Sequence, residues 1–587
     1  MKASFLILEW YTANGRERAR AIEQHICGPF ACISNSTHSI VLSRQSRPYN
    51  AAADTMLLLG HVFGNANVPS EGCVATRLRA LTNNVWGRYT AFARSDDSAY
   101  VMVDPSGAGR AYLVQDDELA MVADHLDPAL MSRAGFAIDV DVSALTGCLL
   151  DPGTMVMAPL LRGVTAMVPG RAYSLGRDGD TIEIWSPVSL AFNDSRDAGA
   201  VAAYRLRAAV DHAVSTMVGT KRPLIELSGG LDSSILAGTM TALGIRASAV
   251  TVTAIGGDVD ELRYAEATAK HARMPLHRGR TATYPKYATF MEAEQVAHPF
   301  IFGVDDAFAD IIRATAGDGI DRIVTGQGGD AVFFQPATPL TTIDRYRACG
   351  WRSGWSALLD DARRTRSSVW HHIGPVVSDL VRGTPALQDE LAGGLLTADA
   401  LAHRKRFEHP WCANARHLPP GRQLQMLMLA NCSIFHSAQP IDLGRPQLHP
   451  LLSQPVIESV LAIPTWQLAS GPLDRGLARR AFADRLHHDI TARRSKGEAA
   501  AYYSRAAVAN LPYLRERLLD GALAKSGIID RCVMEQALTA EYLFYSLDYR
   551  ALILHAACEA WLSAWTQAPV RASCDPLAAE DRPTSWV

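Results

Sequence analysis

The sequence predicts a multidomain α/β protein in which a β-rich N-terminal region precedes a region built on a parallel sheet. Its 587 residues exceed the length of one domain of about 150 residues several times over. Within residues 1–190, apolar runs are short and are broken by Gly, Asn, Asp and Pro, which is typical of strands. From residue 222 onward, strand-like and helix-like segments alternate, and this alternation indicates a parallel sheet.

The composition excludes several classes of protein. Apolar residues make up 48% of the chain and charged residues 20%, which favours packed cores over disorder. The 57 basic and 60 acidic side chains give a net charge of −3, which argues against a dedicated nucleic-acid binder. No apolar run reaches the roughly 18 residues of a membrane span. The apolar stretch that ends at Glu9 is too short for a signal peptide and indicates a strand.

The ten cysteines predict a reducing compartment. They are scattered, no Cys-x-x-Cys pair occurs, and Cys27 and Cys32 have no nearby histidine pair that would complete a zinc site. We therefore expect reduced thiols and a cytoplasmic protein.

The N-terminal strands are predicted from short apolar runs followed by turn residues. Pro169 and Gly170 form a turn signal, and the alternation over 181–185 is that expected of an edge strand. A polar stretch at 193–197 opens a helix that continues to about residue 218, so we place a domain boundary near residue 195. The expected domains are 1–195 and 196–587, and the expected early strands cover 55–60, 88–94 and 100–104.

The second region begins with strand–turn–helix units. Expected strands cover 223–227, 247–253 and 321–325, and expected helices run to about residue 243 and over 260–273. Parallel strands of this kind place ligands at their carboxyl ends. Residues 335–420 give no clear pattern, and the remainder is mostly helical to about residue 566.

The strongest motif is SGGLDSS, from Ser228 to Ser234, directly between a predicted strand and a predicted helix. Two glycines allow a tight turn that brings backbone N–H groups close to an anion. Ser233 and Ser234 add hydroxyl donors, and the start of the helix adds a partial positive charge. Asp232 could hold Mg²⁺ that bridges phosphate oxygens. The Gly-Lys-Ser/Thr ending of a Walker A loop is missing.

This motif resembles the SGGxDS pyrophosphate loop of the ATP-pyrophosphatase superfamily, whose members attach AMP to a carboxylate or carbonyl and release pyrophosphate. A second loop, TGQGGD from Thr325 to Asp330, resembles the SGEGSD loop of asparagine synthetases and the TGYGSD-type loop of β-lactam synthetases. The resemblance implies ATP and Mg²⁺, an adenine nucleotide α-hydrolase-like sheet, and metal binding by Asp232 and Asp330. The implied nucleotide-binding residues are Leu227, Ser228, Gly229, Gly230, Asp232, Ser233, Ser234, Thr325, Gly326, Gly328 and Gly329.

The N-terminal region resembles the glutaminase domain of asparagine synthetase. The segments WGRYTAF (86–92), DPSG (104–107), VPG (168–170) and WSP (185–187) follow the expected order. The resemblance implies an Ntn-hydrolase-like αββα fold. A working glutaminase of this type needs cysteine as its mature N-terminal residue. Residues 2–4 are Lys, Ala and Ser, so we expect a degenerate domain without glutamine hydrolysis.

Within the superfamily, the second loop is closest to the asparagine synthetase-like cyclases of lasso peptide biosynthesis. Gln327 stands where asparagine synthetases carry Glu and β-lactam synthetases Tyr. Since an amide cannot act as a base at neutral pH, Gln327 is expected to position substrate through hydrogen bonds. The segment HPLLSQP (449–455) has the same likeness. Such cyclases adenylate an Asp or Glu side chain of a leader-free peptide, and the peptide's N-terminal amine then closes a macrolactam.

A third element, RRSKGE (493–498), resembles the β-lactam synthetase segment whose lysine stabilises the transition state of acyl-adenylate chemistry. Lys496 and Gln327 are therefore the expected catalytic residues. The preceding stretch 474–485 is predicted to be an amphipathic helix whose arginines mostly face solvent.

Several aromatic and histidine side chains fall in the unassigned segment. They either line a peptide-binding cavity or pack in a core: Trp351, Trp355, Trp370, His371, His372, Trp411 and His417. His487 and His488 are expected to lie on the surface, since adjacent residues of a helix point in different directions.

The sequence therefore favours an ATP-dependent lasso peptide cyclase. Its expected partners are a ribosomally made precursor or core peptide, a leader peptidase and a leader-recognition protein, with no nucleic acid and no membrane span. Two alternatives remain: an asparagine synthetase or β-lactam synthetase-like enzyme that uses ammonia or an intramolecular amine, and a non-catalytic scaffold that binds nucleotide or peptide.

Overall fold

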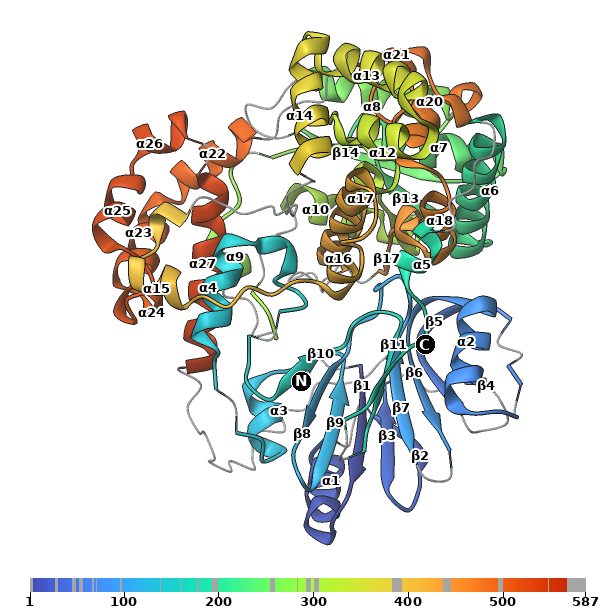
Figure 1. Cartoon of the computed structure of the whole chain (residues 1–587). Coiled ribbons are helices and arrows are strands. Elements are labelled where there is room, and N and C mark those ends of the chain that lie inside the picture. The colour runs from blue at the N-terminus through green and yellow to red at the C-terminus, as the bar shows by residue number, and fades with distance from the viewer. Residues whose placement is uncertain are drawn as a thin grey trace.

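The computed structural model shows a mixed α/β architecture of several parts, as predicted. It describes the chain except for residues 1–3, 27–29, 45–48, 52–55, 66–67, 70, 96–97, 138, 159, 177–178, 193–198, 254–258, 282, 292–296, 300–305, 383–392, 437–444, 495–499, 547 and 567–587. Figure 1 shows the N-terminal sheets in blue, the parallel-sheet part above them, and a group of C-terminal helices in red and orange to one side.

The N-terminal part is built on two six-stranded sheets in which every pairing of the described strands is antiparallel. The first has the order β10-β8-β9-β1-β3-β2, with bounds Val164–Ala166, Tyr112–Gln115, Leu119–Ala123, Phe5–Trp10, Ser39–Ser43 and Ala31–Asn35. The second has the order β12-β11-β7-β6-β5-β4, with bounds Thr181–Glu183, Arg171–Ser174, Ala99–Val103, Val85–Arg94, Met56–Gly64 and Tyr49–Ala51.

The two sheets pack against each other because their strands are apolar on both faces. In β1, Ile7 belongs to the core between the sheets, together with Leu57 and Phe92 of the second sheet. Its neighbours Leu6 and Leu8 point the other way and pack with helix α1 (Ala13–Ile26). On the outer face of the second sheet, helix α2 (Val74–Asn84) packs on β5 and β6. The result is a sandwich of sheets covered by helices.

The second part is a five-stranded sheet of order β15-β14-β13-β16-β17, and all of its pairings are parallel. Its strands are Leu276–Arg280, Ser248–Thr253, Pro223–Glu226, Arg322–Val324 and Gln447–Leu448. Helices cover both faces, as parallel sheets require. Ile225 and Val324 pack with α6 (Gly199–Val218) and α7 (Leu231–Ala242), whereas Leu224 and Ile323 pack with α10 (Asp306–Ala314).

Further helices surround this sheet and extend it. Those near the sheet are α5 (Pro187–Phe192), α8 (Val259–His271), α11 (Gly329–Val332), α12 (Leu340–Cys349), α13 (Trp351–Thr365), α14 (Val369–Arg382), α16 (Pro410–Asn414), α17 (Pro420–Asn431), α18 (Gln454–Leu461), α19 (Thr465–Leu468), α20 (Gly476–Ala481) and α21 (His488–Ala492). Helix α9 (Tyr287–Met291) packs instead with α27 (Tyr549–Thr566) of the C-terminal helices. The segment 335–420, which gave no clear pattern, is therefore largely helical.

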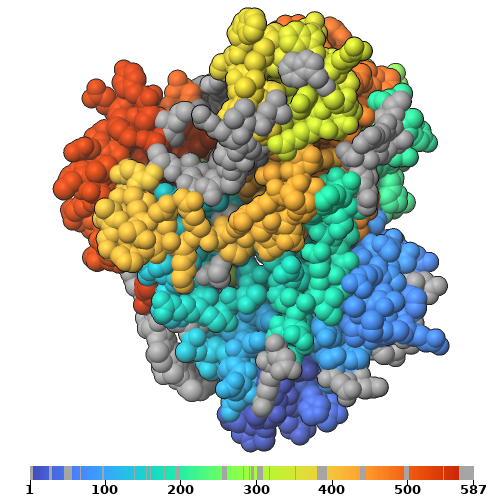
Figure 2. All heavy atoms as spheres, in the orientation of Figure 1, coloured from blue at the N-terminus to red at the C-terminus, as the bar shows by residue number. Residues whose placement is uncertain are grey.

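The C-terminal helices form a third body that is joined to the N-terminal part by a common apolar core. They are α22 (Ala500–Ala509), α23 (Leu511–Asp520), α24 (Ala522–Lys525), α25 (Arg531–Ala537), α26 (Ala540–Tyr545) and α27 (Tyr549–Thr566), and α15 (Ala398–His403) lies beside them. The cluster that holds Leu552 and Leu562 of α27 also contains Leu145 of α4 (Val142–Leu150) and Leu6 of β1. Helix α3 (Pro128–Arg133) belongs to the same cluster. Figure 2 shows these parts packed together.

The predicted strands and helices of the parallel-sheet part agree with the structure within two residues at the ends that it describes, and β12 lies at a sheet edge as predicted. Two strands were missed, β15 and the two-residue β17, because their sequences carry few apolar residues. The amphipathic helix expected over 474–485 is wrong. Only the short α20 and a 3-10 turn at Ala483–Arg485 form there, and Arg475 and Arg479 are buried rather than solvent-facing.

Within the described residues, the structure agrees with two expectations, the lack of a membrane span and the reduced state of the cysteines. No helix among them is long and apolar enough to cross a membrane. The eight cysteines that the structure covers are all free thiols: Cys32, Cys73, Cys148, Cys349, Cys412, Cys432, Cys532 and Cys558.

One buried acid in β1 makes the fold sensitive to pH. Glu9 is 8% exposed, and its Oε2 atom has no hydrogen-bond partner among the residues that the structure describes. Burial raises the pKa of Glu9 from 4.5 to about 7, although Arg94 partly offsets this. Between these two values the folded chain keeps a proton that the unfolded chain loses, so stability falls as the pH rises through this window and stays lower above it.

We therefore predict that Glu9→Gln stabilises the protein at pH 7.5 by about 2–3 kcal/mol, because the neutral amide avoids burial of a charge. Differential scanning calorimetry between about pH 5 and pH 7.5 should show a smaller decline in Tm for this variant than for the wild type. Glu17→Gln, on the exposed side of α1, is the matched control. Equal declines in all three proteins would contradict the assignment.

Candidate active site

The two predicted loops meet at one edge of the parallel sheet. Strand β13 pairs with β14 on one side and with β16 on the other, and all three run in the same direction. The loop 227–230 follows β13, and the loop 325–328 follows β16. This is the point at which the strand order reverses, where open parallel sheets bind their ligands.

The first loop exposes backbone amides at the start of α7. Gly229 has φ +74°, and a Cβ atom there would lie 2.6 Å from the carbonyl oxygen of Glu261, so the position requires glycine. Gly230 is the N-cap of α7 and provides no side chain to cap its first turn. The free N–H groups and the helix dipole therefore favour an anion at this end.

The three loop serines have different surroundings. Ser234 is fully engaged, since its hydroxyl lies 2.7 Å from the Gly230 oxygen and 3.0 Å from the Thr268 hydroxyl of α8. Ser228 and Ser233 make only long contacts, 3.4 Å from each other's hydroxyl oxygen. Ser234 therefore fixes the loop, whereas Ser228 and Ser233 retain hydroxyls that can bind a phosphate.

The second loop fits against the first because its glycines lack side chains. A Cβ atom on Gly329 would lie 2.3 Å from Cγ of Asp232, and one on Gly326 would lie 2.7 Å from the backbone nitrogen of Ser233. Gly328 has φ +82°, and a Cβ atom there would lie 2.2 Å from the Leu452 side chain. The glycines predicted as a nucleotide-binding motif are thus also the positions where the two loops touch.

Thr325 and Gln327 are positioned by His449, the first residue of the HPLLSQP segment, to which the sequence assigned no role. The hydroxyl of Thr325 lies 2.7 Å from Nδ1 of His449, and the Gln327 backbone N–H donates to the same hydroxyl at 3.3 Å. Burial, with a smaller effect of Arg88, lowers the pKa of His449 to about 4, so the ring is neutral at pH 7. The Gln327 carboxamide makes no hydrogen bond to any residue within the described part of the chain, so it is available to a ligand.

Asp232 and Asp330 come together on one guanidinium group. Nη1 of Arg475 donates to Oδ2 of Asp232 and to Oδ1 of Asp330, each at 2.8 Å, and its Nη2 atom lies 2.7 Å from Asp474. Burial alone would lower the pKa of Arg475, but the carboxylates of Asp232, Asp474 and Asp330 outweigh it and raise the pKa. Arg475 also has φ +54°, an uncommon backbone conformation for a residue other than glycine.

The donor set fits a divalent cation. Mg²⁺ is bound through carboxylates together with phosphate oxygens, and Asp232 and Asp330 supply two carboxylates from adjacent loops. The positive charge that the two acids need is provided in this structure by Arg475.

The predicted transition-state lysine, Lys496, lies outside the described residues, but the chain leading to it is anchored at the site. Nη1 of Arg493 donates to the backbone oxygen of Gly229 at 2.8 Å, and its guanidinium lies 4.0 Å from the ring centroid of Tyr264. Arg493 also pairs with Glu261. Arg493 therefore fixes the first loop by binding the backbone oxygen of Gly229.

Sequence reasoning missed Arg475 as a site residue, and although Arg493 and His449 lie in motifs that it quoted, it gave neither a role of its own. The one available signal was charge: two carboxylates beside each other need a cation, and basic residues gather over 474–496. Leu227 contributes through its backbone, since its buried side chain belongs to the core and its N–H donates to Val250 at 2.8 Å.

The aromatic and histidine residues of the segment 335–420 divide between surface and core. Trp355, Trp370, His371 and His417 are exposed, whereas His372 and Trp411 are buried, and the Trp351 side chain lies outside the described set. None of the described members lines the large cavity between the N-terminal and parallel-sheet parts. His487 caps α21 with its ring, and His488 is exposed as predicted.

Comparisons with known proteins identify one family. The model of the family described as Asparagine synthase matches residues 205–441 and 444–563, which is more than half of the chain. Among curated proteins, none matches. Solved structures similar to the chain include the glutamine phosphoribosylpyrophosphate amidotransferase from B. subtilis complexed with ADP and GMP, at 12% identity and a TM-score of 0.20, covering 55% of this chain and 90% of that one. Another is titled the allosteric regulatory enzyme of purine biosynthesis, at 13% identity and a TM-score of 0.19, covering 55% and 89%.

We predict that Arg475→Met lowers the stability of the protein in metal-free buffer by about 2–4 kcal/mol, because it leaves two adjacent carboxylates without their cation. Millimolar Mg²⁺ should then raise the Tm of the variant more than that of the wild type, since the metal replaces the missing charge. Calorimetry with and without Mg²⁺ measures both effects.

The matched control is Arg480→Met, which removes an exposed arginine from the same helix. A variant at Arg475 whose Tm does not respond to Mg²⁺ would contradict a cation site between Asp232 and Asp330.

Gly329→Ala should weaken ATP binding at least about tenfold, because the added methyl group must displace the Asp232 carboxylate. Titration calorimetry with a non-hydrolysable ATP analogue and Mg²⁺ gives the affinity, and circular dichroism confirms the fold. Gly374→Ala, in α14 where a Cβ atom would meet nothing within 4 Å, should bind like the wild type. Unchanged binding by the Gly329 variant would refute the site.

Proposed function

Because the chain belongs to the asparagine synthase family, which implies ATP-dependent amide bond formation, we propose that it is a lasso peptide cyclase. In the proposed reaction, an Asp or Glu side-chain carboxylate of a leader-free core peptide attacks the α-phosphorus of ATP and pyrophosphate leaves. The peptide's N-terminal amine then attacks the activated carbonyl, AMP leaves, and the amine loses a proton. One amide bond is formed for one ATP converted to AMP and pyrophosphate.

The observation that supports this proposal best is the contact between the two loops. Their glycines allow Asp232 and Asp330, which are 98 positions apart in the printed sequence, to share one guanidinium nitrogen at the carboxyl edge of the sheet. A structural turn needs no such convergence of acids, whereas binding of a nucleotide polyphosphate does.

The side chains can be assigned roles on this basis. The amides at the start of α7, with the hydroxyls of Ser228 and Ser233, bind the departing pyrophosphate. Asp232 and Asp330 hold Mg²⁺, which when bound neutralises charge on the phosphate oxygens. Lys496 stabilises the charge that develops at the reacting phosphate and carbonyl, and Gln327 orients the peptide carboxylate by hydrogen bonds.

Arg475 has a second role in this proposal. It neutralises Asp232 and Asp330 before substrates arrive, and its guanidinium gives way when Mg²⁺ and ATP bind. Its existing ion pair with Asp474, whose carboxylate also receives Arg479 at 2.7 Å, would keep its charge paired after it leaves the two acids.

The N-terminal part favours a cyclase over an enzyme that makes asparagine from glutamine. Ser4 lies at the start of β1, where its hydroxyl and its N–H donate to Asp124. No cysteine is among the described residues that line the neighbouring cavity. The domain therefore supplies no thiolate there, which supports an amine brought by the substrate itself. The proposed partners are a core peptide, a leader peptidase and a leader-recognition protein.

Two alternatives share parts of this evidence. An ammonia-dependent asparagine synthetase or a β-lactam synthetase-like enzyme would use the same ATP site with a smaller substrate. A non-catalytic scaffold would bind nucleotide or peptide without turnover, but it would not need two carboxylates poised beside the pyrophosphate loop.

We predict ATP–pyrophosphate exchange that depends on a core peptide with a ring-forming acid, because adenylation is reversible until the amine attacks. Radiolabelled pyrophosphate incorporation into ATP measures it, and mass spectrometry of the peptide detects loss of water on ring closure. Exchange with free aspartate instead of peptide would refute the cyclase, and absence of exchange with any acid would favour the scaffold.

Asp232→Asn should reduce this exchange at least about a hundredfold, because the metal loses a carboxylate ligand. Asp310→Asn, at a surface carboxylate that pairs with Arg313 on α10, is the control and should retain full exchange. If the Asp232 variant kept wild-type exchange, its assignment as a metal ligand would be wrong.

A further inference from the structure

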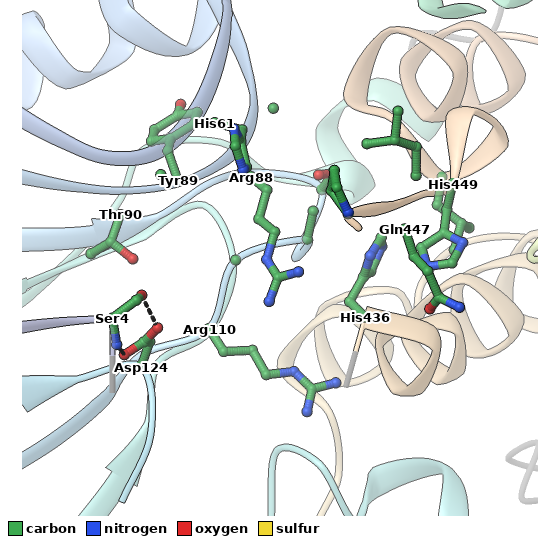
Figure 3. A pocket seen from close by; sticks show the side chains of 18 of the residues that line it. Ser4, His61, Arg88, Tyr89, Thr90, Arg110, Asp124, His436, Gln447 and His449 are labelled. Atoms are coloured by element: carbon green, nitrogen blue, oxygen red, sulfur yellow. Dashed lines mark hydrogen bonds between the residues drawn. The ribbon is translucent and has the colours of Figure 1, made fainter. Parts of the chain in front are cut away.

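A cavity of about 620 Å³ lies between the N-terminal sheets and the parallel-sheet part, and it borders the second nucleotide loop through His449, which contacts Thr325. Its walls come from β5 and β6, from the loop before β8, and from the segment around β17. The volume is in the range of sites for small organic molecules. Figure 3 shows the guanidinium groups of Arg88 and Arg110 directed into this space, with the ring of His436 on the opposite wall.

The two arginines differ in how they are held. Nη1 of Arg110 lies 2.6 Å from Nε2 of His298, and Nη2 donates to the backbone oxygen of Ser433, while its Nε atom is buried without a partner. The backbone of Arg88 belongs to the ladder between β5 and β6, whereas its guanidinium forms no hydrogen bond or ion pair with any residue that the structure describes. The Arg110 guanidinium is therefore held in the cavity wall by its hydrogen bonds, whereas the Arg88 guanidinium is available to bind a ligand.

Among the described lining residues, Asp124 is the one carboxylate, and it is already engaged. It accepts from the backbone N–H of Ser4 at 2.8 Å and from the Ser4 hydroxyl. The positive charge of Arg88 and Arg110 is thus left without a matching negative charge on the described walls. Such a cavity attracts anions and disfavours cations.

The histidines of the cavity respond to this charge. Burial, then His449, Arg88 and Arg110, lower the pKa of His436 well below its usual value. Burial and then Arg110 lower the pKa of His298 to about 3. The rings are neutral at pH 7, and Nε2 of His436, a residue 8% exposed, is buried with no hydrogen-bond partner in the described chain. This nitrogen can therefore form a hydrogen bond with a bound ligand.

We propose that this cavity binds a small organic anion that carries carboxylate or phosphate groups. Arg88 would close on the acidic group by a charge-assisted, two-pronged hydrogen bond, with Arg110 beside it. The rings of Phe63 and Trp86, whose centroids are 4.8 Å apart on the same wall, would contact its apolar part. An amino acid zwitterion fits less well, because the carboxylate that could receive its ammonium group is already bonded to Ser4.

This inference does not depend on the proposed function. Titration calorimetry of the full chain at low ionic strength tests it with citrate, inorganic phosphate and glutamine as probes. We expect saturable binding of citrate or phosphate, one per chain, and which of the two binds distinguishes a carboxylate ligand from a phosphate ligand. Arg88→Gln, an exposed and unpaired position that should fold normally, is expected to lose at least about tenfold in affinity.

Two matched variants locate the binding. Arg162→Gln, at an exposed arginine paired with Asp139, should bind like the wild type. Ser233→Ala reports on the nucleotide loops. Absence of saturable anion binding would overturn the proposal. So would binding that weakens in the Ser233 variant but not in the Arg88 variant, or binding of glutamine alone.

Discussion

The contact of Arg475 with both Asp232 and Asp330 is the interaction on which the site depends. Each carboxylate follows a strand of the parallel sheet, and the strands β13 and β16 are neighbours, so the topology delivers the two acids to one place. Two carboxylates this close repel each other unless a cation lies between them. In this structure the cation is the guanidinium of Arg475, whose backbone has an uncommon conformation, and Gly329 allows the second loop to approach Asp232 closely.

This arrangement gives the site two electrostatic states of similar charge. With Arg475 between them, the acids are neutralised and the loops stay together without ligand. In the proposed function, Mg²⁺ would replace the guanidinium between the same acids when a nucleotide binds, and Arg475 would keep its contact with Asp474. Such an adjustment would leave no unpaired buried charge, because Arg475 keeps its ion pair with Asp474 and the metal replaces the guanidinium between the two acids.

The sequence was sufficient to predict those features of the site that depend on residues close together along the chain. The turn at Gly229, the helix that starts at Leu231 and the strands on either side follow from local spacing, and each appears where expected. Arg475 and His449 could not be found in this way. Their roles depend on contacts with residues more than one hundred positions away, and a buried arginine has the same sequence signature as an exposed one. β17 was missed for a similar reason, since two residues form a strand only because β16 lies beside them.

The central claim is that Asp232 and Asp330 form one cation site from which Arg475 must withdraw. A crystal structure of the full chain grown with Mn²⁺ and pyrophosphate tests it most directly, because anomalous scattering locates the metal independently of any assay. The account predicts a manganese peak between the two carboxylates and an Arg475 guanidinium that no longer contacts both. Pyrophosphate bound at the first loop with no metal between the acids, and with Arg475 still bridging them, would contradict it.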